Sequence, residues 1–245
     1  MSTQKSPPVK RVVKKRKPRA RFSNSWAALG FDVSMSSIAG SVFAYDHTLR
    51  KFKGPYDTIL RWEKSTNYYD RIEQAARGHD LVFNLLVQLN YSIPMSRVAI
   101  AIEEPWSFGH AGKQESGWLK QQAQISGAFM GALLRYGWVN LYEINNSQWR
   151  KIVADDLGIT THWTKWGKGP IGKLRAREWA EAKWPELEKY PDLISSNKLG
   201  LIPRPETSKA KAVQCDDRYD ARAMALWMKN EWSAYLAGQD DTKQH

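Results

Sequence analysis

The first hundred residues alternate between short apolar runs and turn-forming segments. Residues 27–33 and 38–45 are mostly apolar, and the serine-rich stretch between them predicts a turn that joins two strands. A third, weaker strand is expected within residues 55–63. Residues 97–103 form a run of Val, Ala and Ile, which is typical of a central strand buried on both faces. This part of the chain therefore predicts a sheet.

Helical periodicity separates and follows these strands. Apolar positions three and four residues apart predict one long amphipathic helix over residues 69–90 and another over 115–136, with Gly137 as its C-cap. Residues 138–144 predict a further strand.

The last hundred residues are predicted to be mainly helical. Asn146 is placed to cap a helix that Gly158 would stop, and residues 172–184 are helical again. Residues 185–213 hold four prolines and charges of both signs, so we expect an irregular insertion there. A helix over 216–236 closes the fold.

Strands at the start, then strands separated by helices, predict an α/β domain with a mixed sheet flanked by helices. We expect this domain to occupy residues 25–238, interrupted by the insertion at 185–213. A disordered basic arm is expected at 1–24 and a short tail at 239–245.

The net charge of +12 is concentrated at the N-terminus. Residues 1–21 contain nine Lys and Arg residues and no acid, which leaves +3 for residues 22–245. Such an arm gains affinity for nucleic acid by releasing counterions, although a solubilising or targeting tail has the same composition. The densest run of these cations is Lys14, Lys15, Arg16 and Lys17.

Composition narrows the classes of function. No run of about 18 apolar residues is present, so no transmembrane helix is expected, and the N-terminus lacks the apolar core of a secretory signal. Because Cys215 is the single cysteine, the chain offers no internal disulfide and no cysteine-based zinc site, which fits a reducing compartment. The five histidines lack metal-ligand spacing, so we expect any metal to be Mg²⁺ or Mn²⁺ on oxygen ligands.

Acidic residues lie at the ends of apolar elements. Asp32 belongs to the first apolar run, and Glu103 ends the run at 97–103. Near the start of the last helix, Asp217 and Asp220 are three residues apart and share a face, while Asp216 is nearly as well placed. Buried carboxylates are costly unless a cation compensates them. Two metal ions held about 3.5–4 Å apart by such groups can hydrolyse phosphodiesters.

Each acidic group also has an ordinary explanation. Asp32 could cap the turn before Ser34, and Glu103 with Glu104 could form an exposed strand end. Acids at the start of a helix are favoured by its dipole. The joint occurrence of all three groups favours a catalytic site.

Three short motifs follow one another along the chain: Phe31-Asp32-Val33-Ser34, Ala101-Ile102-Glu103-Glu104 and Asp217-Arg218-Tyr219-Asp220-Ala221. In this order they resemble the motifs of the RuvC-type Holliday-junction resolvases, which belong to the RNase H-like nuclease superfamily. The resemblance covers about residues 27–184 and 214–236. It departs from the family at residues 34–37, where a Pro-Gly turn is more usual, and at the 185–213 insertion.

The resemblance implies an RNase H-like fold and an endonuclease that cleaves four-way and other branched DNA as a homodimer. It implies two Mg²⁺ ions per site, with Mn²⁺ as a substitute, and neither a membrane nor a small-molecule cofactor. Trp106 matches an aromatic position near the branch point, and Lys173 matches a basic position near the scissile phosphate. The implied metal ligands are Asp32, Glu103, Asp217 and Asp220, with Asp216 as the alternative to Asp217.

A segment at 161–169 interleaves aromatic and basic side chains, which suits stacking on bases and contact with phosphates. The alternative is that its tryptophans pack on the core or at a dimer interface. The residues concerned are Trp163, Lys165, Trp166 and Lys168.

Two further functions stay open at this point. One is another RNase H-like nuclease or integrase, although position 34 is serine where exonucleases of the superfamily carry the second acid of Asp-x-Glu. The other is a non-catalytic DNA-binding or packaging protein on the same fold. The expected location is the cytoplasm of a bacterium or of a phage-infected cell. A nucleus or organelle stays open because basic runs also serve as import signals.

Overall fold

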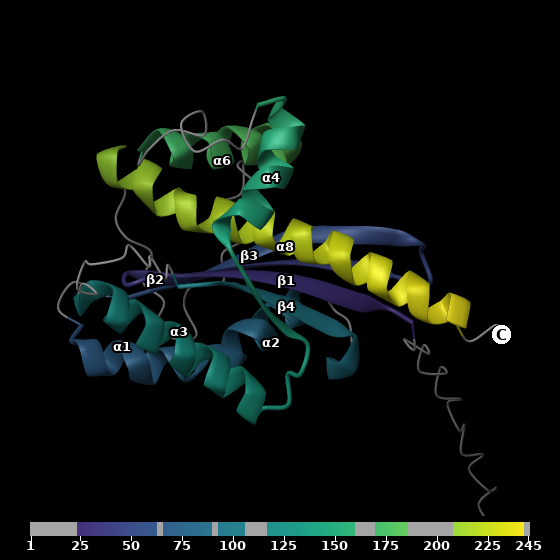
Figure 1. Cartoon of the computed structure of the whole chain (residues 1–245), viewed down its shortest axis with the longest axis horizontal. Coiled ribbons are helices and arrows are strands. Elements are labelled where there is room, and N and C mark those ends of the chain that lie inside the picture. The colour runs from purple at the N-terminus through teal and green to yellow at the C-terminus, as the bar shows by residue number, and fades with distance from the viewer. Residues whose placement is uncertain are drawn as a thin grey trace, which may run out of the picture.

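The protein is described by a computed structural model that shows one mixed five-stranded sheet with helices on both sides (Figure 1). Its residues are described over 24–62, 66–89, 93–105, 117–159, 170–185 and 208–242. The predicted α/β class, with a mixed sheet flanked by helices, is confirmed.

The sheet has the order β3-β2-β1-β4-β5. The strand β1 is antiparallel to β2 and parallel to β4; β2 and β3 are antiparallel, and β4 and β5 are parallel. Three of the five strands agree closely with the predicted positions, whereas β3 begins four residues before the range expected for it and β5 is shorter than predicted. The strands are β1 Trp26–Val33, β2 Ser37–Asp46, β3 Lys51–Arg61, β4 Val98–Glu103 and β5 Leu141–Ile144.

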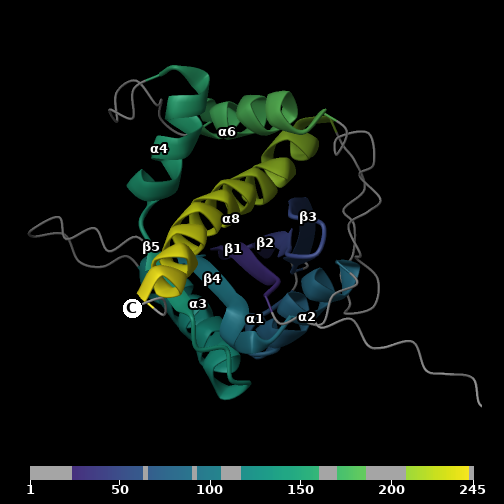
Figure 2. The ribbon, with the colours of Figure 1, turned by 90° about the vertical axis from the view of Figure 1, so that its right-hand side faces the viewer.

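The helices form two layers. On one side of the sheet, α1, α2 and α3 cover a core that contains Leu29, Phe31 and Phe129. On the other side, α8 lies across the strands and is itself covered by α4 and α6 (Figure 2). The bounds are α1 Tyr68–Ala75, α2 Gly78–Gln88, α3 Gly117–Arg135, α4 Asn146–Leu157, α6 Pro170–Lys183 and α8 Ser208–Thr242, and the 3₁₀ turn η1 is Met95–Arg97.

The single helix predicted over residues 69–90 is wrong, because the chain forms α1 and α2 with a break at Ala76 and Arg77. Gly78 begins the second helix directly against the ring of Phe129 on α3, where a Cβ atom would collide with that ring. The apolar spacing runs through the break without interruption, so the local pattern does not reveal it.

Two other helix boundaries differ from the prediction. The cap of α4 is Asn145 rather than Asn146: its side chain accepts from the amides of Ser147 and Gln148, and its own amide donates to the Gln148 side chain at 2.8 Å. Gly158 ends this helix with φ +64°, as predicted. The helix α8 is longer than predicted and includes residues 208–213, expected to be irregular, and 239–242, expected to be tail.

A glycine on β1 sets the distance between the sheet and α8. A Cβ atom at Gly30 would collide with backbone atoms of Ala221, Met224 and Ala225, so only glycine lets the helix lie this close to the strand. Because side chains alternate along a strand, Asp32 lies on the same α8-facing side of the sheet as Gly30.

Candidate active site

The first two acids are brought together by the parallel pairing of β1 and β4. Phe31 pairs with Ile102, so the next residues on the two strands, Asp32 and Glu103, lie at adjacent positions. Glu103 is two residues beyond Ala101, which packs in the core beneath α8. Both acids therefore lie on the α8 side, at the carboxyl ends of neighbouring strands.

The helix α8 supplies the other two acids. Its contact with Gly30 is made at Ala221 and Ala225, and Asp217 and Asp220 lie on the turn immediately before these alanines. Residues at this spacing share one helix face. The close approach of α8 to β1 thus places both carboxylates beside Asp32.

The charges of these acids act on one another. Asp32 is buried, with 6% of its surface exposed. Burial raises the pKa of its carboxyl well above the ordinary value of 3.8, and the negative charges of Glu103, Asp217 and Asp220, together with a hydrogen bond to the Glu103 side chain, raise it further. The structure therefore brings Glu103, Asp217 and Asp220 close enough for their charges to act on Asp32, and we call these four residues the acidic cluster. Glu104 is exposed and is not among the groups that act on Asp32.

The turn after β1 does not need Asp32 as its cap. The amides of Ser36 and Ser37 donate to the hydroxyl oxygen of Ser34, at 3.2 and 3.1 Å. Ser37 begins β2 and donates its own hydroxyl to Oδ2 of Asp217. The ordinary explanation of Asp32 as a turn residue is thus not supported by the geometry of this turn.

A cation that the sequence reasoning missed lies beside the acidic cluster. Arg150, on α4, is partly buried, and burial lowers the pKa of its guanidinium, while the charges of Asp220, Glu103 and Asp32 act in the opposite direction. It follows Trp149, which is buried in the core between α4 and α8. The alternation of a core residue and a cation on one helix is too common to have identified Arg150 from the sequence.

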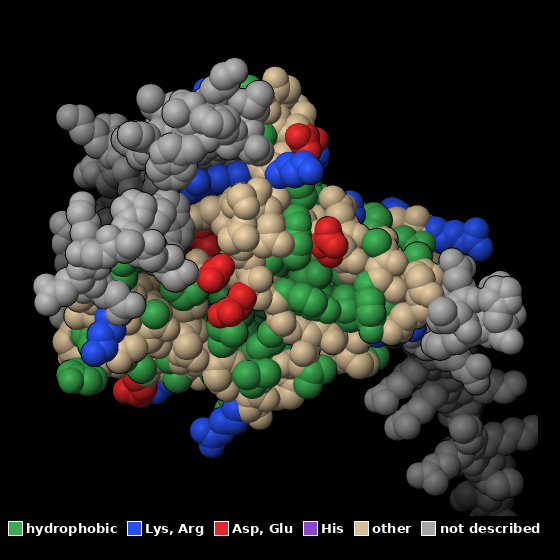
Figure 3. Space-filling view, in the orientation of Figure 1, with side chains coloured by type: hydrophobic (Ala, Val, Ile, Leu, Met, Phe, Trp, Pro, Cys, Tyr) green, Lys and Arg blue, Asp and Glu red, His purple; other side chains and the backbone are tan. Residues whose placement is uncertain are grey.

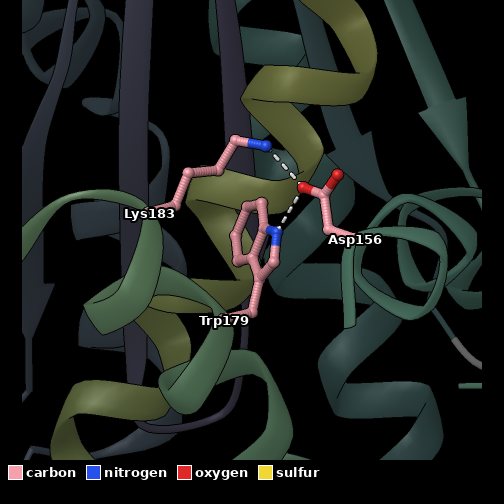
Figure 4. Close-up of polar contacts among 3 residues, drawn as sticks. All are labelled: Asp156, Trp179 and Lys183. Atoms are coloured by element: carbon pink, nitrogen blue, oxygen red, sulfur yellow. Dashed lines mark hydrogen bonds and ion pairs between the residues drawn. The ribbon is translucent and has the colours of Figure 1, made fainter. Parts of the chain in front are cut away.

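The helix that carries Arg150 is fixed to its neighbour by a polar contact (Figure 4). Asp156 on α4 accepts a hydrogen bond from the indole of Trp179 on α6 at 2.7 Å and forms an ion pair with Lys183. Partial burial acts to raise the pKa of Asp156, but these hydrogen bonds and the charge of Lys183 outweigh it and lower the pKa.

The donor set of the acidic cluster is suited to a hard divalent cation, because all four side chains offer carboxylate oxygens. Among the described side chains, however, no group of three or more His, Cys, Asp or Glu residues has the geometry of a ready-made metal site. Mutually repelling carboxylates are expected to stand apart without a cation between them. The acids thus fit such an ion in chemistry, and the roles predicted for them stay predictions.

The remaining predicted site residues are untested, and their roles stay predictions. The arm, Trp106 and the 161–169 segment lie outside the described residues, as do the side chains of Lys173 on α6 and Asp216 on α8. Figure 3 shows Asp and Glu side chains near the middle of one face, with Lys and Arg side chains above them.

Within the described part of the chain, no helix is both long and apolar enough to cross a membrane.

Two solved structures with low sequence identity are similar to this chain. No protein-family model and no curated protein sequence matches the chain. The structure of T. thermophilus RuvC in complex with a Holliday junction substrate matches with 16% identity and a TM-score of 0.45, over 86% of this chain and 96% of that one. A member of the Ppx/GppA family from Aquifex aeolicus matches with 11% identity and a TM-score of 0.30, over 53% of this chain and 40% of that one. The strand order and directions of the sheet are themselves those of an RNase H-like fold.

Proposed function

We propose that this protein is a Mg²⁺-dependent endonuclease that cleaves branched DNA at the acidic cluster. The observation that carries the proposal is the convergence of Asp32, Glu103, Asp217 and Asp220 from β1, β4 and α8, with the pKa of Asp32 raised by burial and by the other three. Like charges gathered around a buried carboxylate are unfavourable in the isolated protein, and perturbed acids of this kind are typical of functional sites.

In this proposal the four carboxylates hold two divalent ions. Such ions, when bound, activate a water molecule and stabilise the leaving oxygen of a phosphodiester. The protein's own groups orient the substrate: Asp32 is fixed by its central strand, and Arg150 on α4 offers a guanidinium to the phosphate.

Branched DNA is proposed as the substrate because the three acidic motifs resemble those of RuvC-type resolvases. The basic arm at residues 1–21 adds affinity for DNA that depends on salt rather than on sequence. A homodimer is part of the same proposal, since paired nicks across a four-way junction require two active sites.

The test is cleavage of a labelled four-way junction beside a matched linear duplex, with Mg²⁺ and with EDTA. We expect paired nicks near the branch that require Mg²⁺ and fall by on the order of 10³-fold in Asp32→Asn, with junction binding retained. The matched control is Asp155→Asn, which removes an exposed carboxylate from α4 and should cut normally.

Two results would contradict the proposal. Full activity in Asp32→Asn would remove the acidic cluster from the chemistry. Tight junction binding without cutting, in Mg²⁺ and in Mn²⁺, would favour a non-catalytic DNA-binding protein.

A further inference from the structure

The serine turn between β1 and β2, residues 34–37, is where the sequence departs from the Pro-Gly turn of the family that it resembles. Its hydroxyl groups form a connected chain. The hydroxyl of Ser34 accepts from the amides of Ser36 and Ser37 and lies 3.2 Å from the hydroxyl of Ser37. Ser37, which is buried with 2% of its surface exposed, then donates to Asp217 on α8.

The turn is also fixed from outside. The guanidinium of Arg71, on α1, donates to the carbonyl oxygen of Met35 at 3.0 Å. The amide of Trp62, directly after β3, donates to the carbonyl oxygen of Ser36 at 3.2 Å. The amide of Ser34 donates to the carbonyl oxygen of Ser37 at 2.8 Å. A hydroxyl carried by such a turn keeps its position, which is what orientation of a partner requires.

We infer that Ser37 is a positioning residue for the metal site: its hydroxyl holds the Asp217 carboxylate toward Asp32 and thereby raises the affinity of the acidic cluster for a divalent cation. This inference rests on the proposed function. A hydrogen bond to one carboxylate oxygen restricts rotation of the group, as partners of metal ligands commonly do.

The same bond addresses the choice between neighbouring acids on α8. The sequence alone leaves Asp216 and Asp217 as alternatives, since each shares a helix face with Asp220. Ser37 bonds to Asp217, and the charge of Asp217 acts on Asp32. Both observations favour Asp217 as the ligand.

Binding of Mn²⁺ to the full-length protein without DNA, followed by electron paramagnetic resonance, tests the inference independently of cleavage. Ser37→Ala should weaken Mn²⁺ binding about 10- to 100-fold, the range found when the partner of a metal ligand is removed. Ser37→Thr keeps the hydroxyl and should restore most of the affinity. Ser36→Ala removes an exposed hydroxyl of the same turn and should bind as wild type does.

A second readout separates positioning from a general loss of structure. In Ser37→Ala, the Mg²⁺ concentration for half-maximal cleavage should rise by a similar factor, while cleavage at saturating Mg²⁺ and the Tm measured in EDTA stay close to wild type. Unchanged Mn²⁺ affinity in Ser37→Ala would overturn the inference, and so would an equal loss in Ser37→Ala and Ser37→Thr. If the wild type bound no Mn²⁺ through Asp32, the proposed function itself would have failed.

Discussion

Two buried carboxylates on the α8 side of the sheet have opposite surroundings. Asp57, on β3, faces the guanidinium of Arg222 on α8, with its Oδ2 at 2.7 Å from Nε and 2.5 Å from Nη2. Asp32, on β1, faces Glu103, Asp217 and Asp220, whose charges raise its pKa. Both carboxylates lie where α8 meets the sheet, so burial alone does not explain the difference.

The difference separates a structural ion pair, Asp57–Arg222, from a candidate binding site, the acidic cluster around Asp32. The Asp57–Arg222 ion pair joins opposite charges within the protein, through the Oδ2 atom of Asp57. At the acidic cluster the protein holds like charges close together at a cost in stability, and a bound cation would recover that cost. The ion pair joins α8 to β3, and α8 in turn carries Asp217 and Asp220.

The largest change in stability is expected from breaking the Asp57–Arg222 ion pair. Arg222→Met leaves Asp57 as a buried charge without its guanidinium partner and should lower the free energy of unfolding by about 3–5 kcal/mol. Urea unfolding followed by circular dichroism measures the change.

The double variant Asp57→Leu with Arg222→Met is the control for this prediction. It removes both charges and should recover most of the lost stability, because well-packed apolar residues often replace a buried ion pair without loss. A double variant as unstable as the single one would show that the packing of Arg222, rather than its charge, anchors the helix.

The local sequence pattern was enough to locate the residues of the acidic cluster but not the Asp57–Arg222 ion pair. Asp32 and Glu103 end apolar runs, and the spacing of Asp217 and Asp220 is visible on their helix. The partners Asp57 and Arg222 are 165 residues apart, and neither lies in a motif. Long-range pairs of this kind follow from the close approach of α8 to the sheet, which tertiary packing decides.

The same reasoning explains the smaller errors of prediction. Arg150 is a cation on an ordinary helix until the fold brings α4 beside the acidic cluster. The break before Gly78 depends on a ring from α3. Two adjacent asparagines, Asn145 and Asn146, offer nearly the same local cap, and the geometry of the first turn selects Asn145. The sheet, whose strands have strong local patterns, was predictable in outline.

A smaller change in stability, of opposite sign, is expected from Asp32→Asn. Because the folded-state pKa of Asp32 lies above the ordinary value of 3.8, its charge costs no stability below that pH, and the cost grows as the pH rises through the folded-state pKa. Asp32→Asn carries no such charge. In EDTA it should therefore be more stable than wild type at neutral pH, by about 2–4 °C in Tm if the difference is about 1 kcal/mol.

Calorimetry from about pH 4 to about pH 8 checks this prediction, with the difference in Tm vanishing at the acid end. Addition of Mg²⁺ should stabilise the wild type and leave Asp32→Asn nearly unchanged. A variant less stable than wild type at neutral pH would mean that hydrogen bonding of Asp32 outweighs its repulsion.

The smallest change in stability is expected from replacing Asp156, the partly exposed carboxylate that contacts Lys183 and Trp179. Its pKa is lowered in the folded protein, so its contribution is present above pH 3.8 and is lost as the pH falls through the folded-state value. The side chains of Lys183 and Asp156 are 37% and 39% exposed, and solvent screening limits the pair to about 0.2–1 kcal/mol. Asp156→Asn should thus be slightly less stable than wild type at neutral pH, with the difference shrinking toward acid. Asp32→Asn should change stability in the opposite direction over the same range, so a shared sign in the two titrations would contradict the distinction between paired and clustered carboxylates.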